Sequence, residues 1–334
     1  MPKLTKHVIV CAMAYFPPYE TVADLAYSSG SPDRVQLCRP RVSVDEAPDG
    51  HQELPVGIYW PITRRHPLGT VCIRSYAWSA SNHPPYQRAR NQAFADTIGM
   101  PLIAPNTIGQ GVDSPPLTAR QIEELYNGQP TDIGRVTVEA CRQAIEPIEK
   151  VQTVVVAGDS QGSSMTPSII EALIDKAEIS HILWATPAGT RPPGSRFGLL
   201  LPMLRTNLYG QNMNVYRKRN PSAFQQLGDT KLLNNLKCQP RAHLLHYPAL
   251  ICSGELTNLT KEVLKELEQP EIHIFAAEND KVSPAKANSD AAQRLGGRLH
   301  ELRGHYHTVT EYIPYIARLF AEAVGVETLT IRQP

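Results

Sequence analysis

The sequence predicts an α/β protein in which a mostly parallel sheet is covered by helices on both faces. Between residues 70 and 186, and again from residue 272, short apolar segments alternate with helical ones. Segments such as Val151–Ala157 are apolar without alternation, which is typical of strands buried on both faces of a parallel sheet. The alternation stops between Pro187 and Tyr247, where the chain is rich in Pro, Asn and Arg. We therefore expect one core, formed by residues 1–186 and 248–334, with a lid inserted at 187–247.

The expected elements follow from apolar periodicity and from Gly and Pro at their ends. Strands are expected over Val8–Phe16, Val35–Val44, Val56–Ile62, Thr70–Tyr76, Pro101–Pro105, Val151–Ala157, Ile179–Thr186, Ile272–Ala276 and Arg298–Leu302. Helices are expected over Tyr86–Ile98, Ile133–Ile148, Ser164–Ala177, Phe197–Tyr209, Pro284–Leu295 and Thr308–Val324, with mostly helix in Ala249–Leu267.

Composition excludes several classes of function. The 334 residues include 42% hydrophobic and 19% charged residues, which allows a substantial core. A formal charge of +1 argues against nucleic acid or an anionic membrane as the main partner. No apolar run approaches the length of a membrane span, and the apolar run near the start is too short for a signal peptide. The six cysteines form no C-x-x-C pair, so we expect a reducing, cytoplasmic location.

The stretch Val154–Met165 carries the clearest chemical signal. Its sequence, VVVAGDSQGSSM, places Ser160 between Gly158 and Gly162, directly after a buried strand and before a helix. Glycines allow a sharp turn with close backbone approach, and the serine in such a turn needs an unfavourable backbone conformation. This pattern is typical of a nucleophile elbow, although a Gly-rich turn between strand and helix would also explain it.

A serine nucleophile needs a histidine base and an orienting carboxylate. Both follow at strand ends. The strand at Ile272–Ala276 runs into the acidic loop ENDKVSP, which contains Asp280, and the strand at Arg298–Leu302 runs into RGHYH, which contains His305 and His307. The order serine, acid, histidine is the one expected for this fold.

These motifs together resemble the α/β-hydrolase superfamily, over residues 56–325. The segment NTIGQGVDS at residues 106–114 is similar to a further motif of that family, with Asn106 in place of the usual Asp. The resemblance implies that Ser160 is the nucleophile, His305 the base and Asp280 its orienting acid. It also implies an oxyanion hole formed by the main-chain N–H of Gln161 and, after the strand at Thr70–Arg74, by that of Tyr76 or Ala77.

Some assignments have alternatives. His307 could replace His305 as the base, although the Gly-His pattern favours His305, and Glu278 could replace Asp280. Asp159 is expected to be a turn or surface residue. His243 and His246 lie three residues apart without obvious further ligands, so neither a metal nor another cofactor is expected.

The expected function is hydrolysis of a carboxylic ester through an acyl-enzyme on Ser160, as in carboxylesterases and lipases. The run Leu199–Leu204 in the expected lid fits an apolar acyl or aryl group in a small-molecule substrate, but it could equally pack the lid onto the core. A thioesterase or a carbon–carbon bond hydrolase would use the same triad. A non-catalytic ligand-binding protein is a further alternative, because the loop after Arg74 lacks the family's usual His-Gly.

Overall fold

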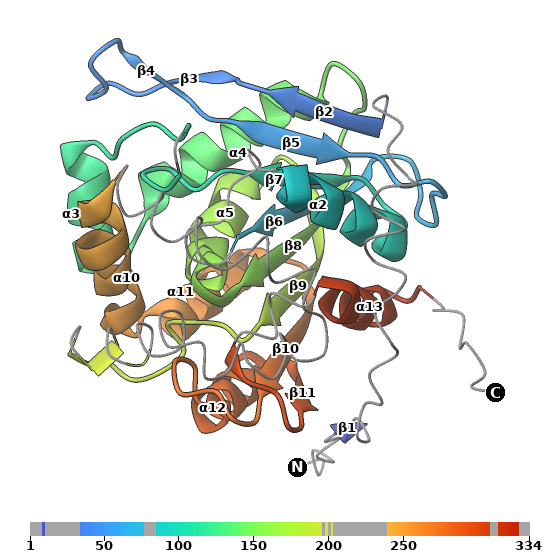
Figure 1. Ribbon diagram of the computed structural model, residues 1–334, viewed down its shortest axis with the longest axis vertical. Helices are drawn as coiled ribbons and strands as arrows, with labels where there is room; N and C mark the ends of the chain where they lie inside the picture. Colours follow the sequence, from blue (N-terminus) through green and yellow to red (C-terminus); the bar gives the residue numbers. More distant parts are fainter. Residues whose placement is uncertain are drawn as a thin grey trace.

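A nine-stranded sheet forms the centre of the molecule (Figure 1). The structure is a computed structural model that describes residues 9–10, 34–76, 85–111, 113–195, 198–199, 202, 239–307 and 313–326. The strands lie side by side in the order β1 (Ile9–Val10), β11 (Arg298–Leu302), β10 (Glu271–Ala277), β9 (Glu178–Ala185), β8 (Thr153–Asp159), β6 (Thr70–Ser75), β7 (Leu102–Pro105), β5 (Val56–Tyr59) and β2 (Val35–Cys38).

The sheet is parallel from β1 to β7. β5 then pairs antiparallel with β7, and β2 pairs antiparallel with β5. The predicted fold class, a mostly parallel sheet with helices on both faces, is confirmed. Because parallel strands end at the same edge, the loops that follow β6, β8, β9, β10 and β11 meet at the carboxyl edge of the sheet.

Helices cover both faces. One face carries α2 (Pro85–Ile98) and α13 (Ile313–Ala323), which pack together beside the sheet in Figure 1. Most of the other helices belong to the opposite side: α3 (Ala119–Asn127), α4 (Thr131–Ile145), α5 (Thr166–Leu173), α10 (Tyr247–Ser253), α11 (Leu256–Val263) and α12 (Ala285–Leu295). Short 3-10 turns cover Ser160–Met165 and Leu264–Glu266. Among the described helices, none is long and apolar enough to cross a membrane.

The strand β8 occupies the middle of the sheet, and this explains its composition. All but its first residue are buried. Val154 and Val156 face one hydrophobic cluster, and Val155 and Ala157 face the other. The continuous apolar run that predicted a two-sided strand is therefore divided between two cores, as expected for alternating side-chain directions.

Two regions differ from the sequence prediction. The strand expected over Val35–Val44 is broken, because β2 ends before Pro40 and a second strand, β3 (Arg41–Ser43), pairs with β4 (His51–Glu53) in a separate hairpin. Proline has no N–H to donate, which fits an interruption there. The helix α3 was not predicted, although Thr118 and Gln121 form a capping box at its start and Gly128 ends it.

The expected lid lies mostly outside the described residues. Of the run Leu199–Leu204, only Leu199 and the position of Pro202 are described. The end of the expected insertion is continuous with the core, because a π-helix over Ala242–His246 runs directly into α10. The hydroxyl of Tyr247 donates to the carbonyl of Ile108 at 2.6 Å, which holds this helix against the loop after β7.

Candidate active site

Ser160 sits in a strained turn at the end of β8. Its φ is +51°, which is uncommon for a residue other than glycine. The prediction of an unfavourable backbone conformation at this serine is therefore confirmed. The main-chain N–H of Ala188, in the loop after β9, donates to the carbonyl of Ser160 at 3.0 Å and helps to hold the turn.

The two glycines around Ser160 are required by space. A Cβ on Gly162 would collide with the carbonyl oxygens of Ser75 and Tyr76, because the elbow lies directly on the chain that leaves β6. A Cβ on Gly158 would lie 2.6 Å from the Cα of Ser163. The turn is therefore wedged between β6 and its own first helical turn, and only glycine fits on either side of the serine.

A chain of two hydrogen bonds links Ser160 to His307 and Asp280. The hydroxyl Oγ of Ser160 lies 2.7 Å from Nε2 of His307, and Nδ1 of His307 lies 2.7 Å from Oδ2 of Asp280. An ionised carboxylate can only accept, so Nδ1 carries the proton of the neutral imidazole. The free lone pair on Nε2 then faces the serine hydroxyl, which is the arrangement that a general base needs.

The acid loop fixes the orientation of Asp280. Its Oδ1 accepts from the main-chain N–H groups of Val282 and Ser283, both at 2.8 Å, which leaves Oδ2 for His307. The loop is joined to the histidine loop by a bond from the N–H of Asn279 to the carbonyl of His305 at 2.9 Å. The two loops therefore hold each other in register.

The expected base, His305, is not the histidine that contacts Ser160. It ends a turn in which its N–H donates to the carbonyl of Leu302 at 3.3 Å, with Gly304 at φ +71°. Its buried ring stacks on Tyr315 of α13, with 4.9 Å between the ring centroids. Residues 302–305 form the turn, and His305 at its end packs against α13. The side chain that contacts Ser160 is therefore the one two residues later, His307.

Glu278, the alternative acid, has a different contact. Its Oε2 accepts from the N–H of Gly304 at 2.7 Å, so it supports the histidine loop rather than the imidazole. Asp280 is the carboxylate that the structure brings to His307, as the sequence reasoning preferred.

The expected oxyanion donors are described in part. Gln161 follows Ser160 in the elbow and is buried, and the Tyr76 backbone lies against Gly162. Ala77 lies outside the described residues. The side chain of Tyr76 points to the helix layer, where its buried hydroxyl accepts from Nδ2 of Asn91 in α2. Burial raises the pKa of this phenol well above its usual value, so the ring serves as a neutral anchor.

Two polar contacts at the site were not foreseen. Nε2 of Gln110, in the loop after β7, donates to Oε1 of Gln161 at 3.1 Å, and both side chains are buried. Asp159 is not a surface residue, because its carboxylate is buried and forms an ion pair with Arg74 of β6. The polar residues in the NTIGQG stretch and an arginine inside an apolar strand were the available signals.

His243 and His246 lie in different surroundings. Across the described ranges, no group of three or more His, Cys, Asp or Glu side chains is arranged to hold a metal ion. Burial lowers the pKa of His243 to about 4, so its ring is neutral at pH 7. The ring of His246 instead packs edge-on against Tyr126 of α3, at 5.7 Å between centroids.

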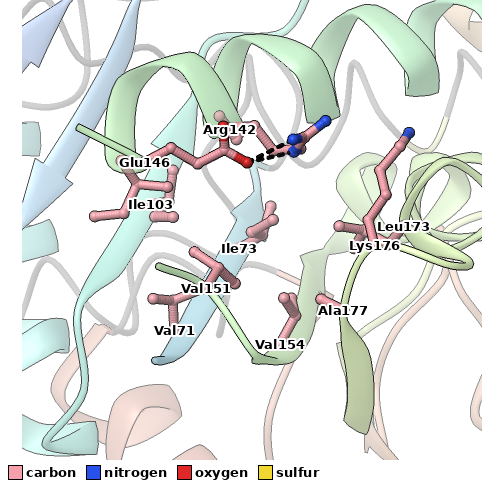
Figure 2. Close-up of a pocket in the computed structure, with 12 residues that line it drawn as sticks. Val71, Ile73, Ile103, Arg142, Glu146, Val151, Val154, Leu173, Lys176 and Ala177 are labelled. Atoms are coloured by element: carbon pink, nitrogen blue, oxygen red, sulfur yellow. Dashed lines mark hydrogen bonds and ion pairs between the residues drawn. The ribbon is translucent and has the colours of Figure 1, made fainter. Parts of the chain in front are cut away.

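A separate cavity of about 30 Å³ lies at the opposite end of the strands (Figure 2). Val71 of β6 and Val154 of β8 line its apolar floor, and Arg142 and Glu146 form an ion pair at its rim at 2.6 Å. Ser160 follows Val154 by six positions along β8, which corresponds to about 20 Å of extended chain. This cavity therefore belongs to the core packing between α4 and α5, away from the candidate site.

Comparison with known proteins identifies the fold. No protein-family model matches the sequence, and no curated protein matches it. Solved structures do match. The 2-hydroxy-6-oxo-6-phenylhexa-2,4-dienoate hydrolase of a Rhodococcus species is 15% identical with a TM-score of 0.52, and the match covers 87% of this chain and 99% of that one. The enol-lactonase of Burkholderia xenovorans is 14% identical with a TM-score of 0.51, and the match covers 85% and 99%. A bromoperoxidase of Bacillus anthracis is 12% identical with a TM-score of 0.51, and the match covers 86% and 98%. The chain has the α/β-hydrolase fold, as the sequence motifs predicted.

Proposed function

We propose that the protein is a serine hydrolase that cleaves a carboxylic ester, with Ser160, His307 and Asp280 as its catalytic triad. The observation that carries the proposal is the unbroken chain of two 2.7 Å contacts from the hydroxyl of Ser160 through His307 to Asp280. The strained φ of +51° at Ser160 supports it, because strain of this kind is maintained where the surrounding structure holds a reactive group in place.

In the first step, Ser160 Oγ attacks the carbonyl carbon of the ester while its proton moves to Nε2 of His307. The carboxylate of Asp280 stabilises the imidazolium through the proton on Nδ1. Negative charge develops on the carbonyl oxygen, and in this proposal it is stabilised by the main-chain N–H of Gln161 and by that of Tyr76 or Ala77. The C–O bond then breaks, and the proton on Nε2 passes to the leaving alcohol.

In the second step, water takes the place of the alcohol. Nε2 of His307 accepts a proton from the water as its oxygen attacks the acyl carbon. The proton returns to Ser160 when the bond to the serine breaks, which releases a carboxylic acid and regenerates the starting state. No step requires a metal or cofactor.

An apolar acyl or aryl group is the substrate feature that best fits the surroundings of the triad. A small buried cluster consists of Ala188, Leu199, Ile251, Cys252 and Val282. Two members adjoin the site directly: Val282 donates its N–H to Asp280, and Ala188 donates its N–H to the carbonyl of Ser160. The chain passes beside Ser160 at Ala188, and we propose that residues 187–247 form a lid over this apolar wall.

The test is labelling with a fluorescent fluorophosphonate, followed by hydrolysis of p-nitrophenyl esters of increasing chain length. We expect rapid labelling of the native protein, none of a Ser160→Ala variant, and a preference for esters longer than acetate. Thioesters and a vinylogous diketone in the same panel separate the two other reactions that this triad could perform. A folded protein that is neither labelled nor active on any of these would contradict the proposal and favour a ligand-binding role.

A further inference from the structure

A buried ion pair lies immediately beneath the elbow. Arg74 is the fifth residue of β6, and Asp159 is the last residue of β8, directly before Ser160. Their side chains are only 1% and 3% exposed. The guanidinium of Arg74 also lies over the ring of Phe94 in α2, with 4.2 Å from Cζ to the ring centroid. The pair therefore joins two neighbouring strands and one helix at a single point.

Stability alone does not explain this pair. Removing two charges from water is expensive, and buried pairs can often be replaced by apolar residues of similar volume without loss of stability. The guanidinium is also incompletely satisfied, since Nε and Nη1 of Arg74 have no hydrogen-bond partner among the described residues. We therefore look for the role of this pair in the spacing of the two strands that it joins.

The position of the pair indicates which geometry that is. In the sheet, Arg74 lies beside Ala157 and Ser75 beside Gly158, so both strands leave the sheet at this level. β8 continues into Ser160 and Gln161, and β6 continues into Tyr76. These are the two chain segments that would supply the two oxyanion donors, and a Cβ on Gly162 would find no room between them.

The β6 side of this junction is held by the helix layer. Tyr76 accepts a hydrogen bond from Asn91 of α2, and Arg74 packs on Phe94, three residues further along the same helix. Phe94 in turn meets Phe320 of α13 edge-on, at 5.7 Å between centroids. The ion pair connects β6, which α2 holds in place, to the elbow, because Arg74 donates to the carboxylate of Asp159.

We propose that Arg74 and Asp159 are positioning residues, which hold the β6 exit and the serine elbow at the spacing that the oxyanion hole requires. This inference rests on the proposed function, since an oxyanion hole has a role only if Ser160 forms an acyl-enzyme. It predicts that loss of the pair lowers kcat with little effect on KM, because the oxyanion contacts strengthen in the transition state.

The main test is the double variant Arg74→Met/Asp159→Leu, which replaces the pair by apolar side chains and leaves no buried charge. We expect its resistance to urea to equal or exceed that of the native protein, while kcat on a p-nitrophenyl ester falls about 10- to 100-fold and KM changes less than about threefold. Arg74→Lys keeps the charge but not the planar contact with Phe94, and an intermediate kcat is expected. A double variant with native kcat would overturn the proposal.

A pH profile of Arg74→Met gives a second readout. This variant leaves the Asp159 carboxylate buried without its cation, close to the site of the developing oxyanion. Two titratable groups in the described part of the chain interact electrostatically with Asp159 besides Arg74: burial raises the pKa of Cys72 to about 12 and that of Tyr76 well above 10. Neither changes charge between pH 5 and pH 9. We therefore expect a new fall of kcat with rising pH in Arg74→Met, absent from the double variant; identical profiles would count against the proposal.

Hydrogen exchange separates failure of this inference from failure of the proposed function. Amide exchange in the segments 75–77 and 160–162 is measured on the native protein and on the double variant, without any substrate. Faster exchange confined to these segments shows that the ion pair holds them in place, and this result stands even if the native protein proves inactive on every ester and the proposed function fails. Unchanged exchange in a protein that does label at Ser160 overturns the positioning role and leaves the esterase proposal intact.

Discussion

Nδ1 of His307 lies 2.7 Å from Oδ2 of Asp280, and this contact separates the roles of two histidines only two residues apart. His305 has its ring stacked on Tyr315 instead. The first histidine packs the loop onto α13, and the second meets the serine. Loss of the His307 ring should therefore lower activity, whereas loss of the His305 ring should lower stability.

We expect His307→Ala to lower kcat on a p-nitrophenyl ester by about 100- to 10,000-fold, because it removes the general base. His305→Phe keeps the stacking with Tyr315 and should retain kcat within about threefold, since the hydroxyl of Ser160 contacts the ring of His307. The converse pattern, in two variants with native circular dichroism, would assign the base to His305.

Gly162→Ala should destabilise the fold as well as the site. The added Cβ meets the backbone of Ser75 and Tyr76, which cannot rotate away as a side chain would. We expect the free energy of unfolding in urea to fall by about 1–3 kcal/mol and labelling at Ser160 to be lost. Gly194→Ala is the matched control, because the nearest atom to its Cβ is the carbonyl oxygen of Pro192 at 3.7 Å, and it should change stability by less than about 0.5 kcal/mol.

Gln161→Ala tests which part of Gln161 acts. The variant loses the contact with Gln110 but keeps the main-chain N–H. If that N–H is the oxyanion donor, kcat should fall less than about tenfold, whereas loss of a true side-chain donor costs about 100- to 1,000-fold. Steady-state kinetics on one ester distinguishes the two, with Gln110→Leu as a control that removes the same contact from the other side.

Acid should weaken the fold through a stack of histidines on three neighbouring strands of the sheet. His273 of β10 lies between His181 of β9 and His300 of β11, with ring centroids 6.2 and 5.2 Å away. Burial, and then its neighbours His300 and Arg298, lower the pKa of His273 to about 4. In the unfolded chain the pKa of this histidine is about 6.5. Between pH 6.5 and pH 4 the unfolded chain therefore binds more protons than the folded protein. The contribution of the stack to stability is complete above about pH 6.5 and falls as the pH drops towards 4.

The measurement is the urea midpoint at pH 7 and at pH 5 for the native protein and for His273→Phe. We expect the variant to lose less stability on acidification, because a phenyl ring keeps the stack without taking up a proton. His51→Ala removes a partly exposed histidine in β4, outside the stack, and should follow the native protein. Equal losses in all three proteins would show that the stack does not control the acid response.

Much of the fold was predictable because apolar runs and turn residues are local signals. Val154–Val156 indicated the central strand, and the glycines around Ser160 indicated the elbow. The choice between His305 and His307 was not predictable, because it depends on where a turn closes and on tertiary packing against the Tyr315 ring of α13, which the histidine motif itself does not reveal. The burial of Asp159 was not predicted because it also depends on tertiary structure: its partner Arg74 lies 85 residues away.

The strands that carry the triad differ in how well they are protected. β8, which holds Ser160, lies in the middle of the sheet and is buried along nearly its whole length. β11, which leads to His307, has one fully buried residue in five and only the short β1 beyond it in the described sheet. Strands near the edge of a sheet can unfold locally while the central strands stay folded. Gentle heating should therefore disconnect the base from an intact nucleophile, and inactivation should be fully reversible over a range of temperatures below global unfolding.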